Sequence, residues 1–288
     1  MGKRKISFEF AAKILFTLSA TAAIIAVGLI CVFLFAQGLP AIWDIGIVNF
    51  LTGTNWRPTW NPPLFGILPM IIGSLYVTAG AILIGVPIGI FAAVFMAKFC
   101  PAPIYVVLKP AINLLAGIPS VVYGYFGMVV LVPFVRNTFG GNGNSILTAS
   151  ILLGMMILPT IITISEAAIR AIPPEIYEGA IALGASHENA SFRVVLPAAK
   201  SGVMASIILG IGRAIGETMA VRMVAGNQAV MRLPHEFLSG ARTLTANVVL
   251  ELGYAYGDHR AALIATGVVL FIFILLINTL FSVLKPKV

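Results

Sequence analysis

The chain has 288 residues, of which 59% are hydrophobic and only 10% are charged. Soluble domains typically contain about 45–50% apolar and about 25% charged residues, so this composition excludes an ordinary water-soluble fold. The formal net charge of +8 would suggest a nucleic-acid partner in a soluble domain, so the positions of the charges decide what it means.

Charged residues are absent from five long runs of the chain. These runs are residues 14–43, 58–97, 110–135, 137–165 and 261–284, and each exceeds the roughly 20 residues that a helix needs to cross a bilayer. A sixth apolar stretch, at about 201–226, contains three charges, Arg213, Glu217 and Arg222. We therefore predict an all-α membrane protein with a transmembrane domain at 11–284, after an N-terminal segment at 1–10. Its six spanning helices are predicted at about 11–37, 67–97, 106–135, 146–170, 201–226 and 261–284.

The basic residues are divided unequally between the two sides of this six-helix scheme. Eleven of the 18, including all eight lysines, fall near the two ends of the chain, in the turn at 98–109 and in the segment 170–200. In the loops on the other side, every basic residue is an arginine. Because loops rich in positive charge stay in the cytoplasm, we expect both termini and residues 171–200 to be cytoplasmic. The net charge therefore indicates orientation, and we expect no nucleic-acid partner.

The first predicted external loop contains all three tryptophans, Trp43, Trp56 and Trp60. Tryptophan commonly anchors a protein at the membrane interface, and the alternative is a docking surface for a partner protein. In the third helix we expect a kink at Pro119. Ser120 or a neighbouring helix is expected to bond with the carbonyl group that the proline leaves free.

The segment 171–200 is longer and more polar than the other predicted cytoplasmic turns. A proline followed by a glutamate suits the first turn of a helix at about 174–183, and Gly184 suits a left-handed C-terminal cap. Ser186 can cap a second helix, and Pro197 limits how far that helix continues. The sequence therefore predicts two short helices joined by a tight turn.

Ile176, Ala180 and Leu183 form an apolar stripe on the first of these two helices. Such a stripe favours a groove in a partner protein. One alternative is a DNA-binding helix-turn-helix unit, but a third helix is missing and acidic residues outnumber basic ones. The other alternative is a helix pair lying on membrane lipid, which the acidic residues also disfavour. These acidic residues are Glu175, Glu178 and Glu188.

The fifth predicted helix carries Arg213 and Glu217 near its centre. Charges in mid-membrane are expensive, so both side chains are expected to face the bundle interior or a water-filled pathway. Four residues apart, they can pair across one helical turn. The alternative to a substrate role is an ion pair that only fixes helix register. In favour of a substrate role, a guanidinium offers a donor fork that matches an oxyanion.

Small residues recur at intervals of four positions in two places on the same helix. Gly202, Ser206 and Gly210 make one, and Gly212 and Gly216 make the other. Both steps allow neighbouring helices to pack closely.

Signatures of catalysis, nucleotide binding and metal binding are missing from the sequence. Ala199-Lys200-Ser201 is the nearest approach to a phosphate-binding P-loop, but its required glycines are replaced by Val194 and Ala199. The three histidines and two cysteines lack metal-ligand spacing. We expect no catalytic residue, no metal and no cofactor in this chain.

The segment 171–200 resembles the cytoplasmic signature of binding-protein-dependent ABC-transporter permeases, which reads Glu-Ala-Ala, three residues, Gly, nine residues, Ile-x-Leu-Pro. It occurs here as Glu178-Gly179-Ala180, Gly184 and Val194-x-Leu196-Pro197. The resemblance implies that this helix pair docks on an ATPase subunit and couples it to the membrane helices. The residues expected to form the coupling surface are Glu178, Gly179, Ala180, Gly184, Ala185, Leu196 and Pro197.

Four further fragments are similar to phosphate permeases, and in particular to their PstC-type subunit. They are Phe50 to Pro58 with Phe65 to Pro69, Ala116 to Gly124, Gly210 to Val221, and Leu244 to Asn247 with Glu251. The resemblance implies the six-helix type I importer (MetI-like) fold in a bacterial or archaeal plasma membrane. It also implies a PstA-type sister permease, two PstB-type ATPase subunits that bind ATP, and a PstS-type extracytoplasmic phosphate-binding protein.

The function predicted on this basis is one membrane half of an ATP-driven phosphate importer, with Arg213 and Glu217 on the substrate pathway. A permease for another oxyanion, such as sulfate or molybdate, remains open because a guanidinium alone does not distinguish them. Inverted halves with broken helices would favour a stand-alone secondary transporter or channel, and the sequence displays no convincing internal repeat. A membrane scaffold would leave the two mid-helix charges unexplained.

Overall fold

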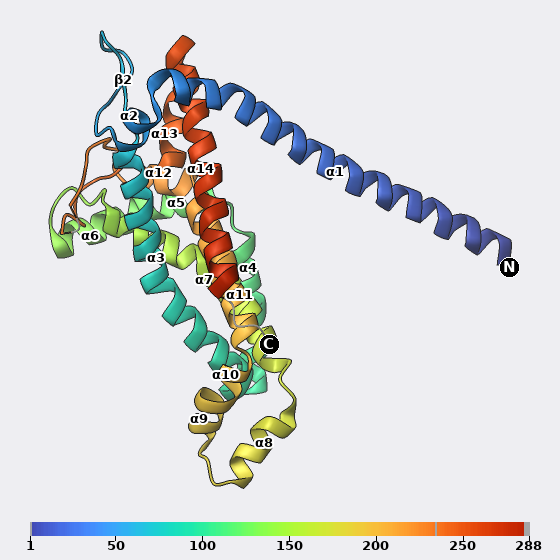
Figure 1. The fold of residues 1–288 in the computed structure, drawn as a ribbon. Helices are drawn as coiled ribbons and strands as arrows, with labels where there is room; N and C mark the ends of the chain where they lie inside the picture. The colour runs from blue at the N-terminus through green and yellow to red at the C-terminus, as the bar shows by residue number, and fades with distance from the viewer. Residues whose placement is uncertain (1, 234, 285–288) are drawn as a thin grey trace.

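The computed structural model describes residues 2–233 and 235–284, and the side chains of residues 10, 12–233 and 235–280. Almost all of this part of the chain is helical (Figure 1). The expected cytoplasmic placement of Lys285 and Lys287 lies outside the described residues.

Among the described residues, five helical segments are long and apolar enough to cross a membrane, and one bent pair of helices could supply a sixth crossing. Four of the five correspond to predicted helices. They are α1 (Gly2–Ile45), α3 (Leu68–Val94) with its π-helical end η1 (Phe95–Phe99), α7 (Ile146–Arg170) and α14 (Gly257–Leu284). Helix α7 covers the predicted range, while α1 continues well past residue 37 and includes Trp43.

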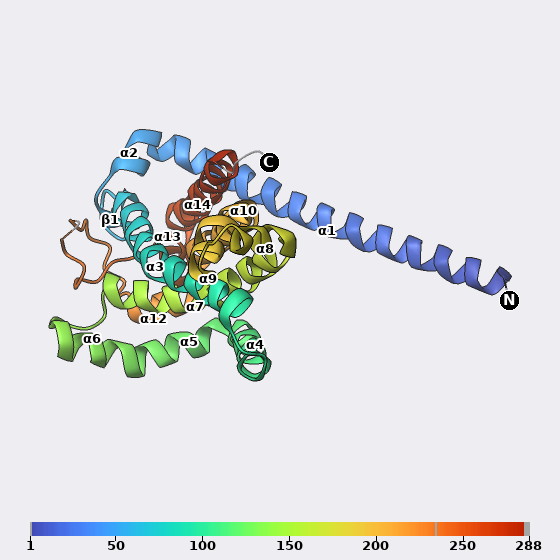
Figure 2. The same ribbon diagram turned by 90° about the horizontal axis from the view of Figure 1, so that it is seen from below.

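The third predicted helix is broken in two, so the prediction of one kinked helix over 106–135 is wrong. Its parts are α4 (Ala102–Gly117) and a second stretch made of α5 (Ser120–Phe126), η2 (Gly127–Leu131) and α6 (Val132–Phe139). Between them Ile118 and Pro119 have extended backbone conformations. Helix α4 lies along the bundle, whereas α5 and α6 run across it (Figures 1 and 2).

The break is completed by a hydrogen bond from a side chain. Leu115 lies four residues before Pro119, which has no N–H to donate to its carbonyl, and the Ile118 N–H donates to this carbonyl at 3.4 Å instead. The Tyr123 hydroxyl donates to this carbonyl at 3.0 Å. The side-chain donor is therefore Tyr123 of α5, the helix that follows the break, and not Ser120.

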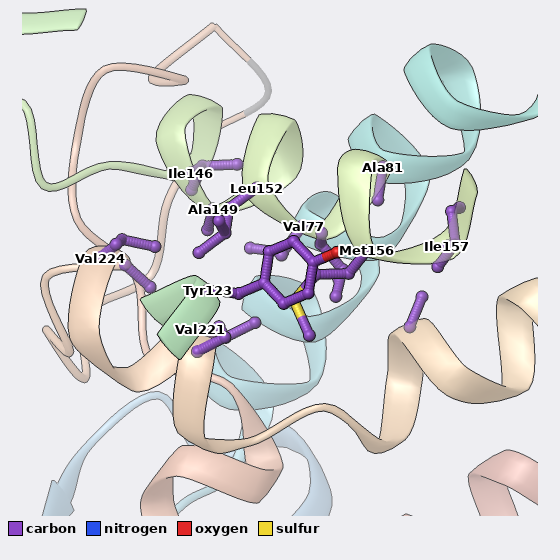
Figure 3. Close-up of a cluster of buried hydrophobic side chains, with 14 of the residues drawn as sticks. Val77, Ala81, Tyr123, Ile146, Ala149, Leu152, Met156, Ile157, Val221 and Val224 are labelled. Atoms are coloured by element: carbon purple, nitrogen blue, oxygen red, sulfur yellow. The ribbon is translucent and has the colours of Figure 1, made fainter. Parts of the chain in front are cut away.

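The fifth predicted helix, at 201–226, is also interrupted. Helix α11 (Lys200–Gly216) ends before Glu217, whose backbone is extended, and α12 (Met219–Val224) begins two residues later. The core lies where these broken helices meet α3 and α7. Figure 3 shows Tyr123 within it, among side chains of those helices. The cluster includes Val77, Ala81, Leu152, Met156, Ile157, Val221 and Val224.

The two ends of the bundle carry different structures (Figure 1). At one end lie α2 (Ile47–Thr52), the paired strands β1 (Trp56–Arg57) and β2 (Leu64–Phe65), α13 (Leu244–Glu251) and the start of α14. At the other end residues 171–200 form a protruding unit, here called the 171–200 hairpin. It contains α8 (Pro174–Ala182), α9 (His187–Asn189), η3 (Ala190–Val195) and α10 (Leu196–Ala198).

Helix α1 projects away from the bundle (Figures 1 and 2). Its most apolar window is not buried by any described residue. It packs on α14 near its C-terminal end, where the rings of Phe35 and Phe271 meet edge to face at 5.7 Å. Most of this helix is therefore available to lipid or to another membrane chain.

Candidate functional site

The break between α11 and α12 separates the two charges that the sequence places on one helical face. An Nη of Arg213 donates to the Thr160 hydroxyl of α7 at 3.3 Å. A carboxylate oxygen of Glu217 instead accepts from the backbone N–H of Ala220 at 3.1 Å, at the start of α12. The ion pairs among the described residues do not join Arg213 to Glu217. The predicted pair is wrong because the helix ends at Gly216, which removes the required spacing of one turn.

The two broken helices lie against each other. Helix α5 packs on α12, and Gly124 permits the close approach, because a Cβ there would lie only 3.0 Å from the Ala220 Cα. Arg213 occupies the last turn of α11, directly before this meeting point. The structure thus brings a half-buried guanidinium and two helix breaks into one region. Broken membrane helices commonly form substrate sites of this kind.

The two small-residue steps on α11 face different surroundings. Gly202 and Gly210 lie against Ala168 and Ile161 of α7, and the Ser206 hydroxyl bonds with that of Ser165 at 2.7 Å. This first step packs as predicted. The second step is different, because a Cβ on Gly216 would meet no described atom within 4 Å and one on Gly212 would meet only Asn278. The face of α11 at Gly216 is therefore left open by the described residues, whereas Gly212 faces Asn278 of α14.

The 171–200 hairpin has the predicted capping geometry. Gly184 has a φ of +88°, in the left-handed region that ends α8. The Ser186 hydroxyl accepts from the Asn189 backbone N–H, which caps the second helix. At the tip Leu183 is 92% exposed and Ile176 is exposed, while Ala180 is half-buried. The apolar stripe is thus left uncovered by the described residues.

The remaining residues of the predicted coupling surface are either exposed or half-buried. Glu178 and Gly179 are exposed, and a Cβ on Gly179 would meet no described atom within 4 Å. Ala185 is half-buried at the turn. Leu196 packs toward the ends of α3 and α7, and Pro197 is exposed. The second helix passes the proline by one residue and then bends by 73° into α11.

A glutamate in the first turn of the second hairpin helix keeps its negative charge readily. The pKa of Glu188 is lowered because its carboxylate accepts from its own backbone N–H and from the Ser186 side chain. This agrees with an acid at the positive end of a helix dipole. The hairpin surface therefore combines exposed carboxylates with an apolar tip.

A second polar cluster, missed in the sequence, lies at the opposite end of the bundle. Glu251 of α13 is 7% exposed and accepts from the Trp56 indole at 2.8 Å and from Arg242 at 2.5 Å. His259 of α14 lies 2.9 Å from the same carboxylate. We call these four residues the Glu251 cluster. They join β1, α13 and α14.

The three tryptophans therefore have different environments. Trp56 is buried in the Glu251 cluster, so interfacial anchoring does not describe it. Trp43 lies on α1 and is 77% exposed. Trp60 is 56% exposed, and its ring carries the Arg57 guanidinium at 3.9 Å. The last two keep the predicted interfacial role open.

We expect Trp56→Phe to lower stability by about 1.5–3 kcal/mol, because it leaves a buried carboxylate without one of its donors. Thermal unfolding of the detergent-purified protein measures this as a fall of several degrees in Tm. Trp60→Phe is the matched control, since its exposed ring makes no hydrogen bond with the described residues. Equal Tm values for the two variants would contradict a structural role for the Glu251 cluster.

A cavity of about 680 Å³ lies between the loop that joins α6 to α7 and the loop at 226–240. Arg136 and Arg232 line it together with Asn142 and Gln228. Arg232 donates to Gln228 and to the Gly240 carbonyl, so this guanidinium is held in place. The lining thus contains two arginines, of which Arg232 also pairs with Glu236 at 3.6 Å. Within the described residues, no group of three or more acidic, histidine or cysteine side chains could hold a metal ion.

Comparison with known proteins agrees with this arrangement. Residues 85–288 match the family described as binding-protein-dependent transport system inner membrane component. Over 283 residues the chain is 42% identical to the probable ABC transporter permease protein YqgH of Bacillus subtilis (strain 168), covering 95% of this chain and 91% of that protein. Over 280 residues it is 35% identical to the phosphate transport system permease protein PstC of Mesorhizobium japonicum, covering 90% and 84%.

The chain also resembles solved structures in its fold. An inward-facing structure of the MetNI methionine ABC transporter matches with a TM-score of 0.61 at 20% identity. The match covers 76% of this chain and 94% of the solved chain. The MetI-like permease fold predicted from the sequence is confirmed.

Proposed function

This chain belongs to the family of binding-protein-dependent transport system inner membrane components, and we propose that the ABC importer of which it is a permease component carries inorganic phosphate. A permease of this family is not an enzyme. The observation that carries the phosphate proposal is the 35% identity, over 90% of the chain, to a protein named as a phosphate permease.

Arg213 is proposed to meet the anion. It is half-buried beside the break in the fifth helix, and the face of α11 at Gly216 is left open by the described residues. A guanidinium in such a place offers several N–H donors to a phosphate oxygen. Glu217 is proposed to act on the same pathway by holding the start of α12, since its carboxylate accepts from the Ala220 N–H.

The partners are proposed from the same family. The uncovered tip of the 171–200 hairpin suits a groove on an ATPase subunit, which would bind ATP in place of this chain. The open face of α11 at Gly216 and the projecting α1 suit a PstA-type sister permease. The arginine-lined cavity at the other end of the bundle suits an acidic surface on a PstS-type binding protein.

The experiment that tests the substrate uses the complete transporter in proteoliposomes. With this chain, its sister permease, the ATPase subunits and the binding protein assembled, labelled phosphate is expected to enter in an ATP-dependent manner. Sulfate and molybdate, each tested with the same complex, are expected to fail both to enter and to compete. Uptake of either at the rate of phosphate would replace the phosphate proposal by a permease for that oxyanion.

A further inference from the structure

A buried carboxylate near the 171–200 hairpin gathers side chains from two helices. Glu166 of α7 is 1% exposed. One of its oxygens accepts from the Tyr105 hydroxyl of α4 at 2.7 Å and from Nε of Arg170 at 2.8 Å. The other accepts from Nζ of Lys109 of α4 at 2.5 Å. We call these four residues the Glu166 cluster.

Arg170 extends the cluster to a third helix. Its second nitrogen donates to the Met96 carbonyl, in the π-helical end of α3, at 2.7 Å. Its guanidinium also stacks over the Tyr105 ring, 4.5 Å from the ring centre. Arg170 is the last residue of α7, and the 171–200 hairpin begins at the next residue. The cluster therefore joins α3, α4 and α7 directly at the base of the hairpin.

Helix α4 has few other attachments. None of its residues is buried. The hydrogen bonds of its described side chains go to Glu166, and at its far end the Leu115 carbonyl accepts from Tyr123. The Glu166 cluster is thus the main polar contact that holds α4 to the rest of the bundle.

The hairpin packs on the same helix ends that the cluster joins. Val195 of η3 and Ala199 are buried against Val94 of α3 and Ile169 of α7. Movement of the hairpin must therefore displace the ends of α3 and α7. Through Glu166 that displacement reaches α4, and α4 leads to the break before α5, which packs on α12 beside the Arg213 region.

A contribution to stability alone does not account for this arrangement. Burying a carboxylate with two cations brings little net stability, because desolvation offsets the attraction. Lys109 and Arg170 have side chains that are 27% and 45% exposed, so only the acid is fully withdrawn from water. The cluster instead fixes the positions of α3, α4 and α7 relative to one another.

We propose that Glu166 is a positioning residue for transport, which ties α4 to α7 so that movement of the 171–200 hairpin reaches the broken helices. This inference rests on the proposed coupling of the hairpin to an ATPase. In this proposal Glu166 acts through α4 and not by contact with substrate or ATP.

The test uses the assembled transporter in proteoliposomes and measures phosphate moved per ATP hydrolysed. Glu166→Gln keeps the shape of the side chain and removes its charge. We expect this variant to retain ATP hydrolysis but to lower the ratio about tenfold, the upper range of coupling effects for such networks. Lys109→Met is expected to do the same, and Lys109→Arg to restore most of the ratio. Lys13→Met, which removes an exposed lysine from α1, is the matched control.

The double variant Glu166→Gln/Lys109→Met is expected to be no worse than either single variant, because both changes break the same contact. An unchanged ratio in both single variants would overturn the proposal. So would a loss of uptake that merely follows the amount of assembled complex, since that describes a folding role alone. Failure of the unmodified complex to take up phosphate is a different result and counts against the proposed substrate instead.

Discussion

Replacing Arg213 by alanine is expected to lower phosphate uptake by about a hundredfold, the loss that follows when a buried anion contact loses its charged donor. The side chain bonds within this chain only to the Thr160 hydroxyl among the described groups, so its removal leaves no buried carboxylate unpaired. The complex should therefore still assemble. Uptake of labelled phosphate into proteoliposomes, normalised to purified complex, measures the effect.

Two further variants define what Arg213 supplies. Arg213→Lys keeps the charge but loses the planar donor fork, so an intermediate rate is expected. Arg260→Ala removes an exposed arginine from the start of α14 and should leave uptake nearly unchanged. Normal uptake by Arg213→Ala, or an equal loss in Arg260→Ala, would contradict a pathway role.

The broken helix also predicts that Arg213 and Glu217 are not equivalent. If they formed an ion pair, neutralising either one would be similarly harmful. In the structure Glu217 accepts from the Ala220 N–H, and a glutamine carbonyl can accept there as well. Glu217→Gln is therefore expected to retain clearly more uptake than Arg213→Gln in the same assay.

The second large effect is expected at the tip of the 171–200 hairpin. Leu183→Asp places a charge where an apolar side chain, 92% exposed in this chain, is proposed to enter a groove on the ATPase. Loss of a fully buried leucine contact is worth about 1.5–3 kcal/mol, so ATPase binding should weaken by roughly tenfold to a hundredfold. Co-purification and titration of ATPase subunits onto the membrane complex measure this directly.

The matched control is Val230→Asp, which makes a similar change at an exposed site in the loop after α12. It should leave ATPase binding unchanged, and both variants should have normal thermal stability because neither side chain packs in the core. If Leu183→Asp binds the ATPase as tightly as the unmodified chain, the hairpin is not the docking element.

Hydrophobic pattern and charge predicted most of the helices well. Helix α7 begins at a serine cap and ends at an arginine, and both signals are local in the sequence. The two breaks were not predicted, since their cause is not local in the same way. A proline in an apolar run suggests a kink, but here the backbone is extended at Ile118 and Pro119, and the Tyr123 hydroxyl, eight residues beyond Leu115, is a second donor to the Leu115 carbonyl.

Candidate site residues were found where a charge is rare for its surroundings. Arg213 and Glu217 stand out in the sequence because they interrupt an apolar run. A pair between them would require a helix that continues past Gly216, where α11 ends. The Glu251 and Glu166 clusters were missed because their members are far apart in sequence. Trp56 and Glu251 are separated by 195 positions, and Lys109 and Glu166 by 57. Only the folded arrangement brings them together.

Helices α1 and α14 pack together although they are far apart in the sequence, so they are synthesised at different times. Helix α1 packs chiefly on α14, which is made only after residues 46–256 have been added. At about 5–20 residues per second this takes roughly 10–40 s. Throughout that interval α1 must persist in the membrane on its own hydrophobicity. A chain truncated before α14 would therefore insert its first helix normally and leave it without a protein neighbour.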